Sequence, residues 1–181
     1  MLTSAALKQF AYEHCNVDKI GIANIERFKD APSDLHPASI MPRAKSVIVF
    51  ARRILRGCYR GIDEGTHWPA YTVFGYAGLT RLVVSAGYKI STFIERYGYE
   101  GAALLPTTSS RLWGPRGPSP GNGKPKREVS ICHRIAATAA GLGAMGWSKV
   151  FLTKEFGPRQ RLGIVLTEAE LEPDPLVTER L

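Results

Sequence analysis

The chain has 181 residues, of which 44% are hydrophobic, and it carries a formal net charge of +8. This composition excludes wholesale disorder, and the length corresponds to one domain that buries about two thirds of its unfolded surface. The positive charge favours anionic partners such as cofactor phosphates, RNA or an acidic protein, and it equally fits a merely soluble basic surface.

The cysteines and the apolar runs indicate the compartment. Cys15, Cys58 and Cys132 stand far apart and form no C-x-x-C pair. An odd, unclustered set argues against a disulfide framework and against a zinc site. The start of the chain has no continuous apolar signal region, and no run approaches about 18 apolar residues. We therefore expect a cytoplasmic protein that has no membrane segment.

The first half of the chain alternates helical and extended patterns. Thr3 or Ser4 can cap a helix that runs to about His14. Residues 17–23 and 46–52 are rich in valine, isoleucine and alanine and are predicted to be strands. The sequence therefore opens as a helix followed by two core strands.

Loops and a long helix follow. Residues 30–42 contain three prolines and are predicted to be a loop with one helical turn, and residues 53–65 form a second loop rich in arginine and glycine. From about 69 to 97, apolar residues recur at helical spacing. This pattern indicates one long helix or two abutting helices that end at Gly98, and glycines inside it favour close packing or a kink.

The second half begins with a short strand at residues 100–105. Residues 106–127 are too rich in glycine and proline for regular structure, so we predict a long, flexible loop that acts as a flap. An alanine-rich helix is expected over 131–140. Together the elements predict a layered domain of the α/β or α+β class.

A glycine-rich segment ends this helix. Gly141, Gly143 and Gly146 are followed by two short β-type runs, at 150–153 and 162–167. Such glycines let the backbone approach a ligand, and successive N–H groups in such a loop form an anion-binding concavity. The alternative is a helix cap followed by a β-hairpin. The segment is not a Rossmann fingerprint, because it follows a helix, and no G-K-[ST] completes a Walker A motif.

The complete segment carries a family resemblance. Its A-G-L-G and L-T-K-E-F-G-P-R-Q-R-L-G-I-V-L-T-E strings resemble the cobalamin-binding half of the epoxyqueuosine reductase and reductive dehalogenase superfamily, and F-G-P-R-Q-R-L-G is closer to the dehalogenase-like branch. Weaker matches, such as V-D-K-I-G-I-A and F-I-E-R-Y-G-Y-E-G-A, extend over most of the chain. The resemblance implies an α+β, nitroreductase-like corrinoid-binding domain over residues 1–181, with a mostly antiparallel or mixed sheet flanked by helices.

The resemblance also implies an oxidoreductase that holds cobalamin against a small-molecule or modified-nucleoside substrate. Backbone N–H groups of the glycine-rich segment suit the cofactor's phosphate and amide groups, basic side chains can add charge-assisted bonds, and apolar side chains can cover the corrin. Simple core packing is the alternative for each apolar residue. The implied cofactor-binding residues are Gly141, Leu142, Gly143, Met145, Gly146, Trp147, Lys149, Phe156, Arg159 and Arg161. We expect a β-carbon at Gly143 to obstruct the cofactor and to spare most core contacts.

The sequence departs from the superfamily where a proton donor is expected. Epoxyqueuosine reductases carry their proposed aspartate acid in a V-D-[ST]-A-P stretch, whereas this chain has K-R-E-V-S-I-C-H there, which puts the queuosine reaction in doubt. Dehalogenase-like enzymes use a tyrosine beside a lysine or arginine. Tyr71 and Tyr76 are therefore the candidate catalytic residues, because a phenol ordinarily keeps its proton at neutral pH. Helix packing is the alternative role for both.

The second departure concerns electron supply. Superfamily members continue into a ferredoxin-like domain with C-x-x-C-x-x-C-x-x-x-C-P runs that bind iron–sulfur clusters. Here that domain is expected only after residue 181, either in a longer chain or as a separate electron-donating ferredoxin-type protein. Two alternatives stay open: a non-catalytic corrinoid carrier or docking module, and a flavin-binding nitroreductase relative.

The basic loop allows a further partner. Lysines and arginines beside Trp113 are compatible with tRNA contacts, although a solvated charged loop explains them more simply, so we expect weak tRNA binding at most. The residues concerned are Arg111, Arg116, Lys124, Lys126 and Arg127.

Overall fold

A four-stranded sheet of order β1-β2-β6-β3 lies at the centre of the protein, in a computed structural model that describes residues 1–105 and 129–179. Each neighbouring pair of strands in this sheet is antiparallel. This arrangement confirms the predicted α+β class with an antiparallel sheet flanked by helices. The strands are β1 (Lys19–Asn24), β2 (Ser46–Arg53), β3 (Gly101–Leu104) and β6 (Gln160–Thr167).

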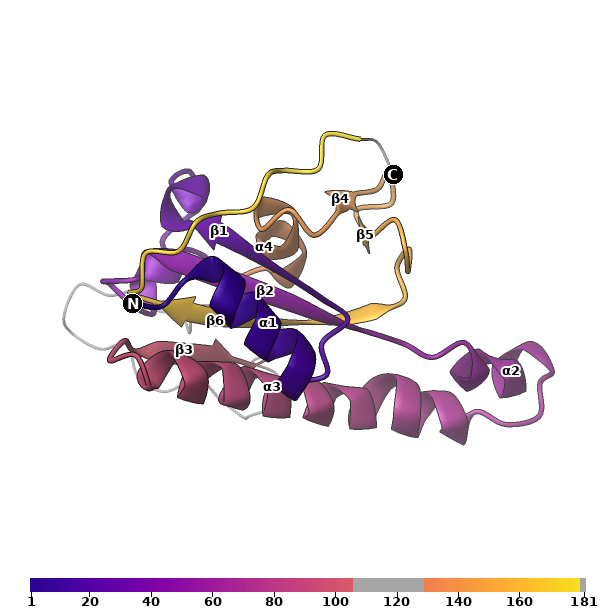
Figure 1. Cartoon of the computed structure of the whole chain (residues 1–181). Coiled ribbons are helices and arrows are strands. Elements are labelled where there is room, and N and C mark those ends of the chain that lie inside the picture. Colours follow the sequence, from indigo (N-terminus) through magenta and orange to yellow (C-terminus); the bar gives the residue numbers. More distant parts are fainter. Residues whose placement is uncertain (106–128, 180–181) are drawn as a thin grey trace, which may run out of the picture.

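Two layers of helices enclose the sheet, because successive side chains of a strand point to opposite faces. Ile48 and Phe50 of β2 pack against α1 (Ser4–His14) and the long helix α3 (Gly78–Glu95). Val47 and Val49 face the opposite way, toward α4. Figure 1 shows α1 and α3 on one side of the sheet and α4 on the other. The second face is completed by η1 (Ile25–Phe28), η2 (Pro37–Ser39), α4 (His133–Ala139) and the small sheet of β4 and β5.

The predicted start of the chain agrees with the structure. The hydroxyl of Thr3 caps α1 by accepting a hydrogen bond of 3.2 Å from the N–H of Ala6. The two predicted strands are β1 and β2, and the helical turn expected within residues 30–42 is η2. The short helix η1 was not predicted.

The arginine- and glycine-rich segment 53–65 was predicted to be a loop, and this prediction is wrong. It contains α2 (Gly57–Asp63), whose Cys58 side chain is buried. Two glycines within seven residues give a low helix propensity, so this helix depends on tertiary contacts that local composition does not encode. In Figure 1, α2 lies at the end of an arm that projects beyond the sheet, next to the N-terminal part of the long helix.

The helical region 69–97 is two abutting helices, which was one of the two predicted forms. The first is a π-helix, η3 (Tyr71–Ala77), and it runs directly into α3. Gly78 is required at the junction, because a β-carbon there would lie 2.3 Å from the carbonyl oxygen of Val73. The chain leaves α3 at Gly98, whose φ of +80° favours glycine.

The β-hairpin that was the alternative interpretation for residues 150–153 and 162–167 does not form. The first run contains β5 (Phe151–Leu152), which pairs with β4 (Ala144–Met145) in a separate two-stranded sheet. The second run belongs to β6, and β6 already has β2 on one edge and β3 on the other. No edge of β6 is therefore left for β5. The predicted flexible loop over residues 106–127 lies outside the described residues, as do all six basic and aromatic residues considered for tRNA contacts.

Candidate functional site

A pair of arginines lies where β2 ends and β6 begins. Arg52 is directly opposite Arg161 in the β2–β6 register, so both side chains leave the sheet on the face that α3 covers. The Arg161 guanidinium carbon lies 4.3 Å from the centre of the Tyr76 ring, and its Nη2 donates a 3.1 Å hydrogen bond to Thr80 Oγ1. Arg52 Nε is buried and has no hydrogen-bond partner among the described residues. This corner therefore holds two adjacent cations beside a tyrosine.

The π-helix η3 carries both candidate tyrosines. π-helices are rare and occur frequently at functional sites. Tyr76 is half exposed, whereas Tyr71 packs closely against Gly75: a β-carbon at Gly75 would lie 2.9 Å from Tyr71 Cδ2 and 3.2 Å from Ile54 Cγ2. The structure thus brings Tyr76, but not Tyr71, into contact with Arg161.

Tyr59 on α2 is a further candidate site residue, which the sequence did not indicate. Its ring lies 5.5 Å from the ring of Tyr71, in a tilted arrangement. Burial raises the pKa of Tyr59, the nearby Tyr71 raises it further, and the positive charge of Arg159 opposes both effects. The only available sequence signal was an aromatic residue between arginines, in a segment that was predicted to be a loop.

His133, at the start of α4, is a second residue that was missed. Neither ring nitrogen has a hydrogen-bond partner of normal geometry among the described residues. The backbone of Leu105, and less so that of Ile131, lies close enough to favour the charged form. Burial lowers the pKa of His133 to about 4, and the positive charge of Arg161 lowers it as well. His133 is therefore a neutral imidazole near Arg161 at neutral pH.

The glycine-rich segment is tightly packed against the protein. A β-carbon at Gly143 would lie 2.0 Å from the carbonyl oxygen of Leu152, and one at Gly141 would lie 2.2 Å from that of Pro175. At Gly146 the nearest atom would be Leu152 Cδ1, at 2.8 Å. The expectation that a β-carbon at Gly143 spares the core contacts is therefore wrong, because it overlooked the backbone of β5.

The backbone N–H groups of this segment are largely used within the protein. Gly141 and Leu142 donate to the carbonyls of Thr138 and Ala137, both at 3.0 Å, in the pattern of a helix C-cap. Gly146 donates to Val150 at 2.9 Å. Any charge-assisted bond to a cofactor at this segment must therefore come mainly from side chains.

The side chains of the segment divide into buried and exposed ones. Leu142 is buried in the core, which removes it from the residues able to cover a cofactor. Met145 and Trp147 are exposed, the latter at 85%. Lys149 lies in the following turn with a φ of +60°, and its N–H donates to the carbonyl of Gly146. Apolar and basic groups are thus exposed along β4 and this turn.

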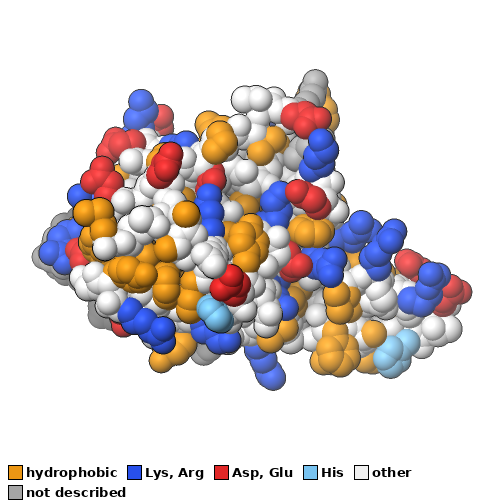
Figure 2. Space-filling model, viewed as in Figure 1, with side chains coloured by type: hydrophobic (Ala, Val, Ile, Leu, Met, Phe, Trp, Pro, Cys, Tyr) orange, Lys and Arg blue, Asp and Glu red, His pale blue; other side chains and the backbone are white. Residues whose placement is uncertain are grey.

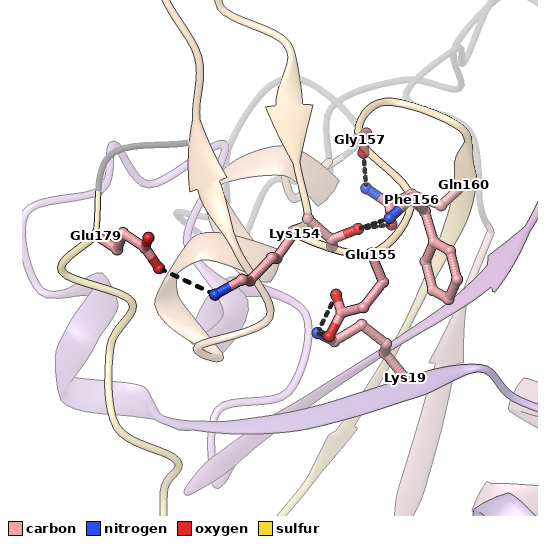
Figure 3. A network of polar contacts seen from close by, with 8 residues as sticks. Lys19, Lys154, Glu155, Phe156, Gly157, Gln160 and Glu179 are labelled. Carbon is pink, nitrogen blue, oxygen red and sulfur yellow. Dashed lines mark hydrogen bonds and ion pairs between the residues drawn. The ribbon is translucent and has the colours of Figure 1, made fainter.

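The connection from β5 to β6 presents Phe156 and Arg159 and is fixed by a local hydrogen-bond network (Figure 3). Thr153 Oγ1 donates to Gln160 Oε1 at 2.9 Å and accepts from the N–H of Phe156 at 3.2 Å. Gln160 Nε2 donates to the carbonyl of Gly157 at 2.9 Å. Side-chain bonds thus fix the shape of this turn.

An ion pair ties the same connection to β1. Lys19 Nζ lies 2.7 Å from a carboxylate oxygen of Glu155, and the hydrogen bond from Lys19 holds the pKa of Glu155 below its ordinary value. Partial burial of Glu155 opposes this shift. The connection is therefore held from two sides, which fixes the backbone that carries Phe156 and Arg159.

Two negative findings apply to the residues that the structure describes. Within 1–105 and 129–179, no helix has both the length and the apolar character needed to cross a bilayer. Within the same ranges, no three side chains of the histidine, cysteine, aspartate or glutamate type are grouped to hold a metal ion.

Sequence comparison points to reductive dehalogenases. The chain is 30% identical over 134 residues to tetrachloroethene reductive dehalogenases from Desulfitobacterium hafniense and Dehalobacter restrictus. The match covers 73% of this chain but only 19% of either relative, so the chain spans about a fifth of the length of the relatives it matches. No protein-family profile matches the chain.

Solved structures share the fold over nearly the whole chain. An epoxyqueuosine reductase from Streptococcus thermophilus matches with a TM-score of 0.63 at 15% identity, over 97% of this chain and 48% of that protein. A catabolic reductive dehalogenase matches with a TM-score of 0.65 at 16% identity, over 95% of this chain and 22% of that protein. The resemblance predicted from the glycine-rich segment is thereby confirmed: the chain shares its fold with epoxyqueuosine reductases and reductive dehalogenases and is similar in sequence to the latter.

Proposed function

We propose that the chain is the cobalamin-binding domain of a reductase of the dehalogenase-like type, in which Tyr76 donates a proton to the substrate. The observation that supports this proposal is the contact between Arg161 and Tyr76, because a tyrosine beside a cation is the acid that the resemblance to dehalogenases implies. Tyr71, which packs against Gly75 and Tyr59, is the weaker candidate.

The chain's own residues fit a large, partly apolar and partly anionic cofactor. Met145, Trp147 and Phe156 offer apolar surface, and Lys149 and Arg159 offer cations along the same stretch of chain. The buried Arg52 Nε, which lacks a partner among the described residues, is a further donor. A corrinoid, when bound and reduced, supplies a strongly nucleophilic metal centre for the reduction.

The protein's part in such a reaction is to hold and release a proton. The Tyr76 hydroxyl carries this proton, and Thr80 fixes the guanidinium of Arg161 by a hydrogen bond. Arg161 holds the Tyr76 ring in place by its contact with the ring face, and the half-exposed position of Tyr76 lets water restore the proton after it has left. Electrons would come from iron–sulfur clusters of a ferredoxin-type domain or protein, and the substrate would be a small molecule.

The first test is cofactor binding by the purified chain. Titration with hydroxocobalamin should change the corrin absorption bands, and the cofactor should remain with the protein on gel filtration. We expect Arg161→Gln to weaken binding about tenfold, which corresponds to ~1.4 kcal/mol. Arg96→Gln, an exposed arginine at the other end of α3, is the matched control and should bind like the wild type.

Two outcomes would count against the proposal. No spectral change and no retention at micromolar protein would remove the corrinoid. Tight binding of flavin mononucleotide, visible as a yellow protein, would favour the flavin-binding relative instead.

A further inference from the structure

A groove lies between the α2 arm and the connection from β5 to β6. It consists of two adjoining clefts, of about 640 Å³ and 670 Å³, and Arg56 and Arg159 line both. The first cleft is otherwise lined by Arg53, Ile54, Leu55, Gly57, Glu155 and Phe156. The second is otherwise lined by Tyr59, Arg60 and Asp63. We call the two clefts together the arginine groove.

The positive charge of the arginine groove is only partly balanced. Arg53 pairs with Asp18 at 3.3 Å, and Arg60 pairs with Glu64 at 3.2 Å. By contrast, Arg56 and Arg159 have no carboxylate partner within the described part of the chain. These two shared arginines therefore provide two unneutralised guanidinium groups.

The acidic side chains of the groove do not cancel this charge. Glu155 is already paired with Lys19, which leaves Asp63 as the remaining carboxylate among the described lining residues. Figure 2 shows lysine and arginine side chains gathered where the α2 arm leaves the body of the protein. An anion that enters the groove thus meets a net positive charge at its centre.

The groove also has an apolar wall. Ile54, Leu55 and Phe156 line the first cleft together with the charged residues, and Leu55 is 57% exposed although it is a large apolar residue. Tyr59 adds an aromatic ring to the second cleft. An exposed apolar wall beside free guanidinium groups suits a ligand that has an anionic end and a flat, weakly polar body.

We propose that the arginine groove binds the phosphate group of a small phosphorylated ligand of nucleotide size. Guanidinium groups bind phosphate oxygens through paired, parallel hydrogen bonds, which are stronger and more directional than those of lysine. Two such groups at the junction of the clefts place the phosphate there and leave the body of the ligand against Phe156 and Leu55. Clefts of about 640 Å³ and 670 Å³ have the size of small-molecule binding sites.

Two kinds of ligand carry a phosphate group that fits this groove. A free nucleotide is one, and the nucleotide tail of a corrinoid, which contains a phosphodiester, is the other. Only the second source rests on the proposed function, because Arg159 and Phe156 belong to the implied cofactor-binding set. Arg56 does not belong to that set, so its substitution tests the groove by itself.

The test is binding of pyrophosphate and of adenosine monophosphate to the purified, corrinoid-free chain, measured by isothermal titration calorimetry. We expect millimolar or tighter binding, near −4 kcal/mol or better, and a loss of about tenfold or more in Arg56→Gln. Arg56→Lys should keep part of the affinity, because it retains the charge but loses the paired hydrogen bonds. Arg96→Gln, which makes the same charge change far from the groove, should bind like the wild type.

Competition then identifies the source. If bound pyrophosphate weakens binding of hydroxocobalamin but not of cobinamide, which lacks the nucleotide tail, the groove holds the tail. If pyrophosphate weakens neither, the groove holds a separate nucleotide. Equal binding by Arg56→Gln and the wild type, or no binding of either phosphate, overturns the proposal. Preferential binding of an RNA oligonucleotide also overturns it. Failure of hydroxocobalamin to bind would contradict the proposed function but not the phosphate site, since the pyrophosphate titration uses the corrinoid-free chain.

Discussion

Substituting Gly143 by alanine should destabilise the protein strongly. An ideal β-carbon at this position lies 2.0 Å from the carbonyl oxygen of Leu152 and 3.0 Å from both the carbonyl carbon of Leu152 and Phe151 Cζ. Normal contacts begin at about 3.4 Å, so the backbone of β4 or β5 must move by more than 1 Å. Overpacking ordinarily costs 1–3 kcal/mol, and a contact with backbone cannot be relieved by a rotamer change, so we expect about 3 kcal/mol.

Gly57 is the matched control, because a β-carbon there meets nothing within 4 Å and the residue lies in α2. Gly57→Ala should leave the unfolding free energy unchanged or raise it by up to about 1 kcal/mol. Urea denaturation of both variants measures the difference, and Gly143→Ala should also lower the melting temperature by roughly 10 °C. An unfolding free energy of Gly143→Ala within about 0.5 kcal/mol of the wild type would refute the packing argument.

Three further predictions concern pH and surface contacts. The pKa of His133 is about 4 in the folded protein instead of 6.5, so His133 takes up a proton at a higher pH in the unfolded chain than in the folded one. The free energy of unfolding should therefore fall by up to about 3 kcal/mol as the pH is lowered from 6.5 to about 4. The same fall should be much smaller in His133→Gln. Lys19→Met should cost less than about 1 kcal/mol, mostly at low salt, because Glu155 is half exposed. The stability that this pair gives the protein is present above the ordinary pKa of Glu155 and is lost as the pH falls through its lowered pKa. Asp174→Ala, which removes an acceptor for a β1 N–H at 2.8 Å, should cost about 1–2 kcal/mol, whereas exposed Glu172→Ala should cost almost nothing in the same denaturation assay.

Much of the fold could be predicted because it depends on local sequence patterns. The capping hydroxyl of Thr3, the apolar run of β2 and the helical spacing of α3 each depend on neighbouring residues only. The pairing of β5 could not be predicted in this way. It depends on β6 being occupied on both edges, and that is a property of the whole sheet.

The site could be predicted only in part, for a related reason. The resemblance indicated Arg161 and Tyr76 separately, but their contact arises from the packing of η3 against the end of the sheet. The glycines of the segment were predicted to let the backbone approach a ligand, whereas in the structure Gly143 lets the backbone approach β5. Tyr59 was missed because it lies on a helix with poor intrinsic propensity.

The placement of arginines explains why the end of the sheet where β2 ends and β6 begins is a better candidate site than the glycine-rich segment. The chain has two consecutive arginines at the end of β2 and a second pair around the start of β6, and antiparallel pairing brings these distant segments together. Arg52 thus stands directly opposite Arg161, although like charges across a strand pair are destabilising. Proteins break such local rules chiefly at functional sites, where another interaction compensates. Tyr76 compensates Arg161 in part through its ring, whereas Arg52 Nε, buried and without a partner among the described residues, does not gain a compensating contact from them. A bound electron-rich group would supply that contact, which supports placing the proposed cofactor at this end of the protein.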